Sequence, residues 1–155
     1  MPSFSLRKHE GLIRCLSDRL TDDSDEVREE AMNSLIKMAP VFPSGCEEVL
    51  RRELRHKVEK HRKSAFVALK STSQRWAETG CLHLDELIRE EDVDLRRRAS
   101  SILRVLATKG GAEGWDLIGW CLEDEDAEVR RRASKTLDSL AGAEPRIAAI
   151  LVEVA

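Results

Sequence analysis

The sequence has 155 residues, of which 41% are hydrophobic and 35% charged, and its net charge is −3. This balance is typical of a folded globular domain and argues against intrinsic disorder. The slight excess of acidic residues excludes an overall attraction to nucleic acid or anionic membranes, and no stretch approaches the ~20 apolar residues of a membrane span. Aromatic residues make up only 4% of the chain, which favours packed helices over a β-sandwich or barrel.

The sequence repeats itself at intervals of 34 residues, without any insertion. An arginine, an alanine and a leucine recur in every copy. The recurring residues are Arg28, Arg62, Arg96 and Arg130, then Ala31, Ala65, Ala99 and Ala133, then Leu35, Leu69, Leu103 and Leu137. We therefore predict a single domain over residues 1–155. Its four units lie at residues 7–40, 41–74, 75–108 and 109–142, with a partial fifth unit at 143–155.

Each unit contains two apolar sets with helical spacing. In the first unit these are Ile13, Leu16 and Leu20, followed by Val27, Ala31, Leu35 and Met38. Proline and glycine separate the units. In every unit except the second, an acidic turn precedes the second helix, and its carboxylates can accept hydrogen bonds from the first N–H groups of that helix. Each unit is therefore expected to be a helical hairpin, and "STSQRWAETG" and "TKGGAEG" are expected to be loops between helices.

The spacing of an acid, an arginine, an alanine and a leucine resembles the HEAT repeat family over essentially the whole chain. The acid and the arginine of the pattern are Asp22 and Arg28, Glu90 and Arg96, and Asp124 and Arg130. The resemblance implies an all-α, right-handed α–α superhelix of four antiparallel helix pairs plus a trailing helix. It also implies a structural ladder, formed by these residues and Arg62, that bridges neighbouring turns, and second helices that line a concave binding side.

The positions that do not repeat are those expected to carry function. Just after the ladder arginine, the second helices are acidic in the first unit and basic in the next three. The basic residues that we predict to bind an acidic or phosphorylated protein segment are Lys63, Arg97, Arg98, Arg131 and Arg132. Trp120 replaces charged residues of the other units and is predicted to be an exposed partner contact. The alternative is that these charges form only a solvated face.

A second hypothesis is that the same stripe binds the backbone of a nucleic acid. The second unit departs most from the repeat, with His56 at the acid position and His61 where the others have Val or Leu. It also holds the densest basic run, and its residues Arg51, Arg52, Arg55 and Lys57 would extend the stripe. The absence of interleaved aromatic residues favours a protein partner over nucleic acid.

The C-terminal residues 147–154 are apolar on nearly all sides of the predicted trailing helix. A terminal helix of a repeat array needs a polar outer face, so we expect that the array continues, or that a partner or self-association covers this helix. The cysteines lack CxxC spacing and no signal-peptide pattern precedes them, which predicts reduced thiols in the cytoplasm.

An enzymatic function is not expected. A HEAT-type di-iron hydroxylase needs several His-Glu pairs, and only His9-Glu10 occurs. The histidines lack HxH or HExxH spacing, and no GxSxG or phosphate-binding loop is present, so we predict no metal and no cofactor. The remote alternatives are a relative of the HEAT-like DNA glycosylases, with Trp120 as candidate, or of the bilin lyases. Trp115 is expected in the core, and Trp76 at the junction of the second and third units.

Overall fold

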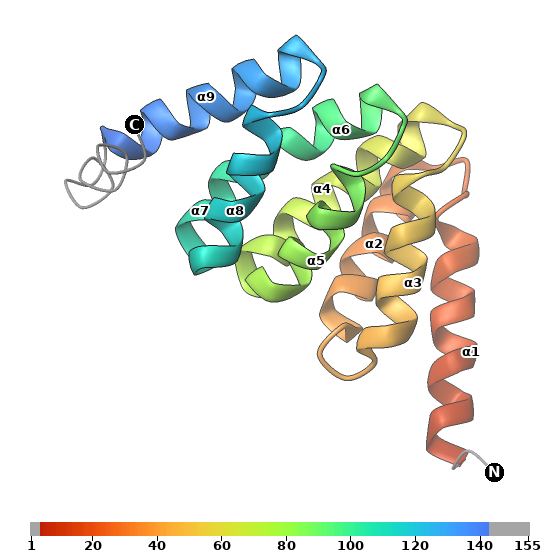
Figure 1. Ribbon diagram of the computed structural model, residues 1–155. Coiled ribbons are helices and arrows are strands. Elements are labelled where there is room, and N and C mark those ends of the chain that lie inside the picture. Colours follow the sequence, from red (N-terminus) through yellow and green to blue (C-terminus); the bar gives the residue numbers. More distant parts are fainter. Residues whose placement is uncertain (1–3, 143–155) are drawn as a thin grey trace. The chain divides into compact units, whose positions relative to one another are not determined.

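The computed structural model describes residues 4–142, and their side chains from residue 10 onward. The secondary structure of this part of the chain is helical throughout, with turns between the helices and no strand, which confirms the predicted all-α class (Figure 1). The helices are α1 (Phe4–Arg19), α2 (Asp25–Met38), α3 (Pro43–Leu54), α4 (Glu59–Arg75), α5 (Ala77–Leu87), α6 (Val93–Ser100), α7 (Leu103–Lys109), α8 (Gly111–Leu122) and α9 (Ala127–Ala141). The predicted trailing helix at 143–155 and its self-associating segment 147–154 lie outside the described residues.

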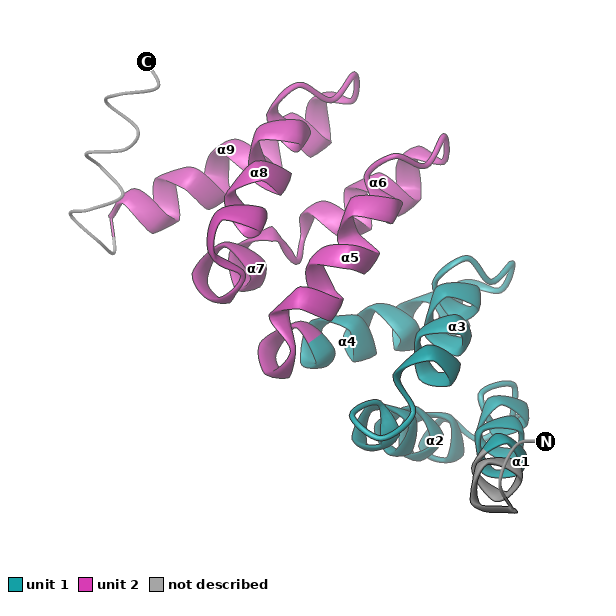
Figure 2. Cartoon of the chain, turned by 60° about the horizontal axis from the view of Figure 1, so that its bottom comes forward, with its two compact units in different colours: residues 1–72 teal, residues 73–155 magenta. Residues whose placement is uncertain are grey.

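The chain forms two compact units, residues 1–72 and 73–155 (Figure 2). In the first unit, α1 packs on α3, and α2 packs against both. In the second unit, α5 packs on α8, while α6 and α7 pack on α9. Within each unit the first helix of one repeat therefore lies against the first helix of the next, and in the second unit the second helices also stack on each other.

The repeating alanine belongs to the core of every repeat. Ala31, Ala65, Ala99 and Ala133 are all buried. The apolar set predicted for the second helix of the first repeat is partly wrong, because Val27 is exposed whereas Met32 and Ile36 are buried. The core face of α2 is thus rotated toward the neighbouring positions, with Arg28 buried beside it.

The turns before the second helices cap those helices as the acidic residues predict. The side chain of Asp92 accepts a hydrogen bond from the N–H of Asp94, and Asp126 accepts from Glu128 and Val129. In the first repeat the cap is Ser24 rather than a carboxylate. Each cap satisfies an N–H group that the helix itself leaves without an acceptor.

The second helix of the third repeat is broken, although one continuous helix was expected. The hydroxyls of Ser100 and Ser101 donate to the carbonyls of Arg97 and Arg98, three residues earlier. The N–H groups of Ser101 and Ile102 also bond three residues back. Serine side chains compete in this way with the regular helical bonds, and the tighter turn separates α6 from α7.

Two segments expected to be loops are mostly helical. In the segment "STSQRWAETG", Trp76 is the only residue between the end of α4 and the start of α5. In the second, Gly110 is the only residue between α7 and α8, and Gly111 opens α8 with a φ of 58°. That left-handed conformation favours glycine and permits the immediate reversal of the chain. None of the helices from α1 to α9 combines the length and apolarity needed to cross a bilayer.

Candidate functional site

The four ladder arginines make the same backbone contacts. In every repeat, Nη1 donates to the carbonyls five and six residues earlier, at the end of the turn before the second helix. The carbonyls belong to Asp22 and Asp23 for Arg28, His56 and Lys57 for Arg62, Glu90 and Glu91 for Arg96, and Asp124 and Glu125 for Arg130. Each arginine therefore closes the turn of its own hairpin, a structural contact that occupies one end of its guanidinium.

One rung of the ladder also joins two repeats. The Nε of Arg96 lies 3.0 Å from Oδ2 of Asp124 in the next repeat. The corresponding rung between the first two repeats would join Arg28 to position 56, which is His56. The imidazole Nδ1 there accepts from the N–H of Val58 at 3.0 Å, and among the described residues the buried Nε of Arg28 has no hydrogen-bond partner. The ladder is thus interrupted where an acid is replaced by histidine.

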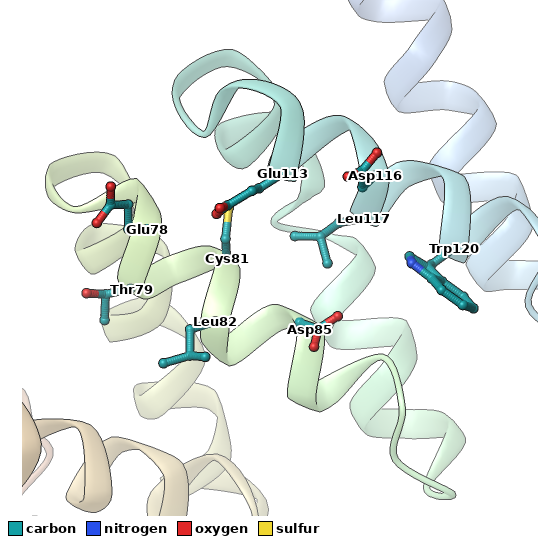
Figure 3. A pocket seen from close by; sticks show the side chains of 9 residues that line it. All are labelled: Glu78, Thr79, Cys81, Leu82, Asp85, Glu113, Asp116, Leu117 and Trp120. Atoms are coloured by element: carbon teal, nitrogen blue, oxygen red, sulfur yellow. The ribbon is translucent and has the colours of Figure 1, made fainter. Parts of the chain in front are cut away.

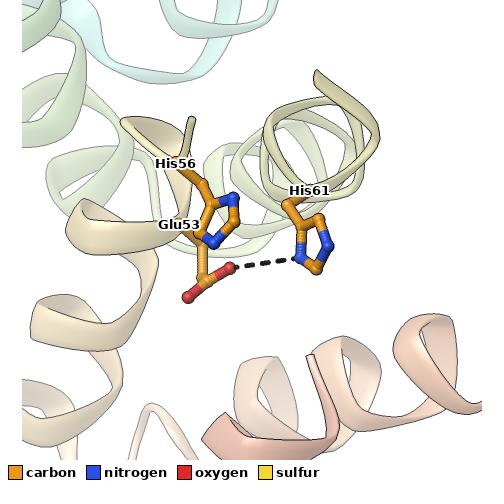
Figure 4. Close-up of side chains that lie close together, drawn as sticks. All are labelled: Glu53, His56 and His61. Carbon is orange, nitrogen blue, oxygen red and sulfur yellow. Dashed lines mark ion pairs between the residues drawn. The ribbon is translucent and has the colours of Figure 1, made fainter. Parts of the chain in front are cut away.

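The structure gathers Glu53, His56 and His61, a cluster that spacing did not reveal (Figure 4). Glu53 and His61 are 2% and 6% exposed and occupy positions that are apolar and buried in the third and fourth repeats. Oε2 of Glu53 lies 3.8 Å from Nδ1 of His61, and burial is the main cause that lowers the pKa of His61. His61 is therefore neutral at pH 7.

The contacts of this cluster do not fit a bound metal ion. The two imidazole rings are stacked with centroids 4.3 Å apart and 26° between their planes, so their in-plane lone pairs do not converge on one point about 2 Å away. Arg52 already donates to Oε1 of Glu53, and Nδ1 of His56 is engaged with Val58. Binding of a cation would require the two rings to turn out of this stacked arrangement.

Three arginines of the predicted basic stripe form ion pairs within the second unit. Arg97 on α6 forms a two-pronged ion pair with Asp126, at 3.0 and 2.8 Å. Arg131 and Arg132 on α9 both donate to the carboxylate of Glu128. Arg132 also donates to the carbonyl of Arg97 at 2.6 Å. The pair of Arg97 with Asp126 depends on the stacking of α9 on α6, which the sequence pattern does not report. The pairs of Glu128 with Arg131 and Arg132 have the i,i+3 and i,i+4 spacing of a single helix, a local signal that the sequence does carry.

A basic groove of about 400 Å³ nevertheless opens between α6–α7 and α9. We call it the α6–α9 groove. Its lining residues are Ser100, Ser101, Arg104, Arg131, Arg132, Lys135, Thr136 and Ser139. Four of these side chains are cationic and none is acidic. The hydroxyls of Ser100, Ser101 and Thr136 donate within their own helices, so the cations are what this groove offers to a ligand.

In the first unit the predicted basic residues fall on two separate surfaces. Lys63 on α4 lines a groove shared with Glu29 of α2, and its ammonium lies 3.3 Å from Glu59. Arg51 and Arg52 on α3, with Arg55 directly after that helix, line a different groove, shared with α1. Arg52 also donates to Ser17 of α1. The structure therefore does not bring Arg51, Arg52 and Arg55 together with Lys63 as one stripe.

Trp120 does not belong to the basic stripe either. Its side chain is 56% exposed on α8 and lines a groove with α5, a first helix like α8 (Figure 3). The stripe residues Arg131 and Arg132 lie on α9 and line the α6–α9 groove instead. The predicted set of partner contacts must therefore be divided, because first and second helices present different surfaces.

The remaining side chains to consider are two tryptophans and the four cysteines. Trp115 is half-buried rather than fully in the core as predicted, and Trp76 is also half-buried. Burial raises the pKa of the Cys121 thiol to about 12, and it also raises the pKa of Cys46 and Cys81, aided by Glu47 and Glu113. Thiols with raised pKa values are poor nucleophiles near neutral pH. Cys15 is exposed, and none of the four cysteines forms a disulfide.

No known protein family matches the sequence. No curated protein matches it either. Among solved structures, the chain is similar to an engineered protein, with 21% identity and a TM-score of 0.42, over 81% of this chain and 60% of that one. It is also similar to computationally designed armadillo repeat proteins for modular peptide recognition, with 20% identity and a TM-score of 0.47, over 96% of this chain and 72% of that one. Similarity at these levels carries no information on function.

Proposed function

We propose that this chain is a non-enzymatic binding module that holds an acidic or phosphorylated protein segment in the α6–α9 groove. The observation that carries the proposal is the charge of that groove, which has four cationic side chains and no carboxylate in its lining. Guanidinium groups bind carboxylates and phosphates in the same two-pronged geometry, and charged hydrogen bonds are about twice as strong as neutral ones.

Within the α6–α9 groove, Arg104 and Lys135 are the principal contacts. Both side chains are exposed, and neither forms an ion pair with another described residue. Arg131 and Arg132 are partly neutralised by Glu128 and contribute less to the attraction. Arg97 and Arg98 belong to the proposed surface as flanking charges, with Arg97 mainly structural because Asp126 holds it. Lys63 lies on a groove of the first unit, and its role in binding stays a separate prediction.

Binding of a nucleic acid backbone is the second candidate. The cationic lining of the α6–α9 groove favours it, because phosphates are bound by the same groups. The distribution of Arg51, Arg52 and Arg55 on a different groove from Lys63 speaks against one long track in the first unit. An acidic protein segment therefore remains the main proposal.

Three further properties belong to the same proposal. The repeated arginine contact in all four hairpins supports membership of the HEAT family. The single repeat domain over residues 1–155 and the right-handed superhelix remain predictions. The reduced cysteines support a cytoplasmic location. Self-association through residues 147–154 remains a prediction.

The test is the binding of a labelled phosphoserine- and glutamate-rich peptide, followed by fluorescence anisotropy. Reversal of Arg104→Glu together with Lys135→Glu should weaken binding at least about tenfold, which corresponds to about 1.4 kcal/mol. Trp120→Ala lies on another groove and serves as the control, with unchanged affinity. Equal binding by wild type and the double variant would refute the proposal.

The same titration with duplex DNA separates the two candidates. Backbone binding should be detectable at about 50 mM salt and should weaken steeply at about 200 mM, since each neutralised phosphate releases counterions. Tight DNA binding together with no peptide binding would favour the second candidate.

A further inference from the structure

The groove between α5 and α8 has a character opposite to that of the α6–α9 groove. It encloses about 560 Å³, and we call it the α5–α8 groove. Its lining residues are Glu78, Thr79, Cys81, Leu82, Asp85, Glu113, Asp116, Leu117 and Trp120. Figure 3 shows that these side chains come from two facing helices, with Glu78 and Asp85 on α5 and Glu113 and Asp116 on α8. Four carboxylates and no cation line the groove.

The apolar part of this groove is unusually exposed for a helix surface. The side chains of Leu82 and Trp120 are 48% and 56% exposed. Both stand at positions where the other repeats have charged residues. The equivalents of Leu82 are Arg14, Glu48 and Asp116, and those of Trp120 are Asp18, Arg52 and Glu86. Two independent departures from the repeat thus meet in one groove, where they expose apolar area to solvent at a cost in free energy.

The chain itself shows how this groove accommodates a cation. The guanidinium carbon of Arg89 lies 5.0 Å from the centre of the Trp120 ring, within the range of a cation–π interaction. The same guanidinium forms an ion pair with Asp85 at 3.0 Å. An aromatic face and a carboxylate therefore already bind one arginine at the end of the groove, and Glu113 and Asp116 offer further carboxylates along α8.

We propose that the α5–α8 groove is a docking site for a basic segment of a partner protein that carries arginine or lysine beside an apolar side chain. The apolar residue packs on Leu82 and Trp120, and the cationic residues pair with Glu78, Glu113 and Asp116. Charge complementarity selects this occupant, because an acidic segment or a nucleic acid would meet Glu78, Glu113 and Asp116 beside the Asp85–Arg89 pair. Exposed tryptophan is also a residue type that often dominates binding energy at interfaces.

This docking site is independent of the proposed function of the α6–α9 groove. The two grooves lie on different helices of the second unit and have opposite charge, so each selects a different ligand. A chain with both sites joins an acidic segment of one protein to a basic segment of another. Failure of either site leaves the other untouched.

The probe is a short labelled peptide in which arginine and leucine alternate, with a matched peptide in which glutamate replaces every arginine. Wild type should bind the arginine peptide and not the glutamate peptide. Leu82→Ala with Trp120→Ala should weaken binding of the arginine peptide about tenfold or more without any change in net charge. Glu113→Lys with Asp116→Lys should weaken it further.

A matched control separates the effect of the groove residues from the effect of the overall charge of the protein. Glu29→Lys with Glu30→Lys makes the same change in net charge on α2, outside the α5–α8 groove, and should leave the affinity nearly unchanged. Circular dichroism checks that each variant remains helical. If the control and the groove variant lose affinity equally, the site does not exist as proposed.

The oligomeric state tests whether a second copy of this chain, rather than a basic partner, occupies the α5–α8 groove. Sedimentation of wild type should show no dimer that depends on Leu82 and Trp120. A dimer that is lost in the Leu82→Ala/Trp120→Ala variant would show that a second copy fills the groove, and the proposed basic partner would be wrong.

Discussion

Arg96 of the third repeat reaches Asp124 of the fourth, with Nε and Oδ2 3.0 Å apart and with side chains only 11% and 8% exposed. The same guanidinium donates from Nη1 to the carbonyls of Glu90 and Glu91. A single side chain therefore closes one turn and ties it to the next. Since the pair is shielded from water, each of its bonds is stronger than at the surface.

Replacement of Arg96 by alanine should destabilise the fold by about 2–4 kcal/mol. The change leaves Asp124 as a buried charge without its main partner and removes the donor to two carbonyls. Urea unfolding measured by circular dichroism gives the free energy of unfolding. Arg104→Ala, at an exposed position, is the control and should change it by less than about 0.5 kcal/mol.

Replacement of His56 by aspartate should stabilise the fold by about 1 kcal/mol. The new carboxylate would stand in the same relation to Arg28 as Asp124 does to Arg96, and it would give the buried Nε of Arg28 an acceptor. It would also keep the bond to the N–H of Val58 that Nδ1 of His56 now accepts. Chemical denaturation measures the gain.

Lys57→Gln makes the same change of one unit in charge on the adjacent exposed residue and should not stabilise the fold. If His56→Asp proves neutral or destabilising, the missing ladder contact does not lower the stability of the fold. The cluster of His56 with Glu53 and His61 would then contribute stability that the repeat pattern does not predict.

The pH dependence of stability should include a contribution from Glu128. Hydrogen bonds from Arg131 and Arg132 lower the pKa of this carboxyl from 4.5 to about 2. As the pH falls, the unfolded chain therefore binds this proton before the folded chain does. The contribution of Glu128 to the free energy of unfolding is present above about pH 4.5 and is lost as the pH falls from about 4.5 to about 2. Asp126, whose pKa Arg97 also lowers, acts in the same direction.

Unfolding of wild type and Glu128→Gln at about pH 5 and about pH 3 measures this contribution, since acid titrates the carboxyl only in wild type. The stability difference between the two proteins should shrink at the lower pH. A difference that stays constant would show that the ion pair with Arg131 and Arg132 has no net effect in solution.

Two glycines of α8 should respond oppositely to alanine. A Cβ on Gly114 would lie 2.1 Å from the carbonyl oxygen of Leu106, so Gly114→Ala should cost about 1–3 kcal/mol. A Cβ on Gly119 meets nothing within 4 Å, and Gly119→Ala should stabilise the helix by about 0.5–1 kcal/mol. Thermal unfolding of both variants checks the pair. A similar effect of both would contradict the close approach of α7 to α8.

The sequence by itself determined the helix pairs and their caps. Apolar residues at helical spacing can be buried only on one face, and a small residue such as Ala99 or Ala133 at a fixed place permits close helix packing. The same pattern predicted the exposure of Trp120, because its equivalents in the other repeats are charged.

Only the tertiary structure decided which charges are available. The stacking of α9 on α6 brings Asp126 to Arg97 and brings Arg132 to the carbonyl of Arg97, so part of the apparent basic stripe is engaged within the protein. It also separates Trp120, on a first helix, from those arginines on second helices. Repeat spacing shows which positions are equivalent. Ion-pair partners that are far apart in the sequence depend on the distance and rotation between packed helices, and a local sequence pattern does not give these.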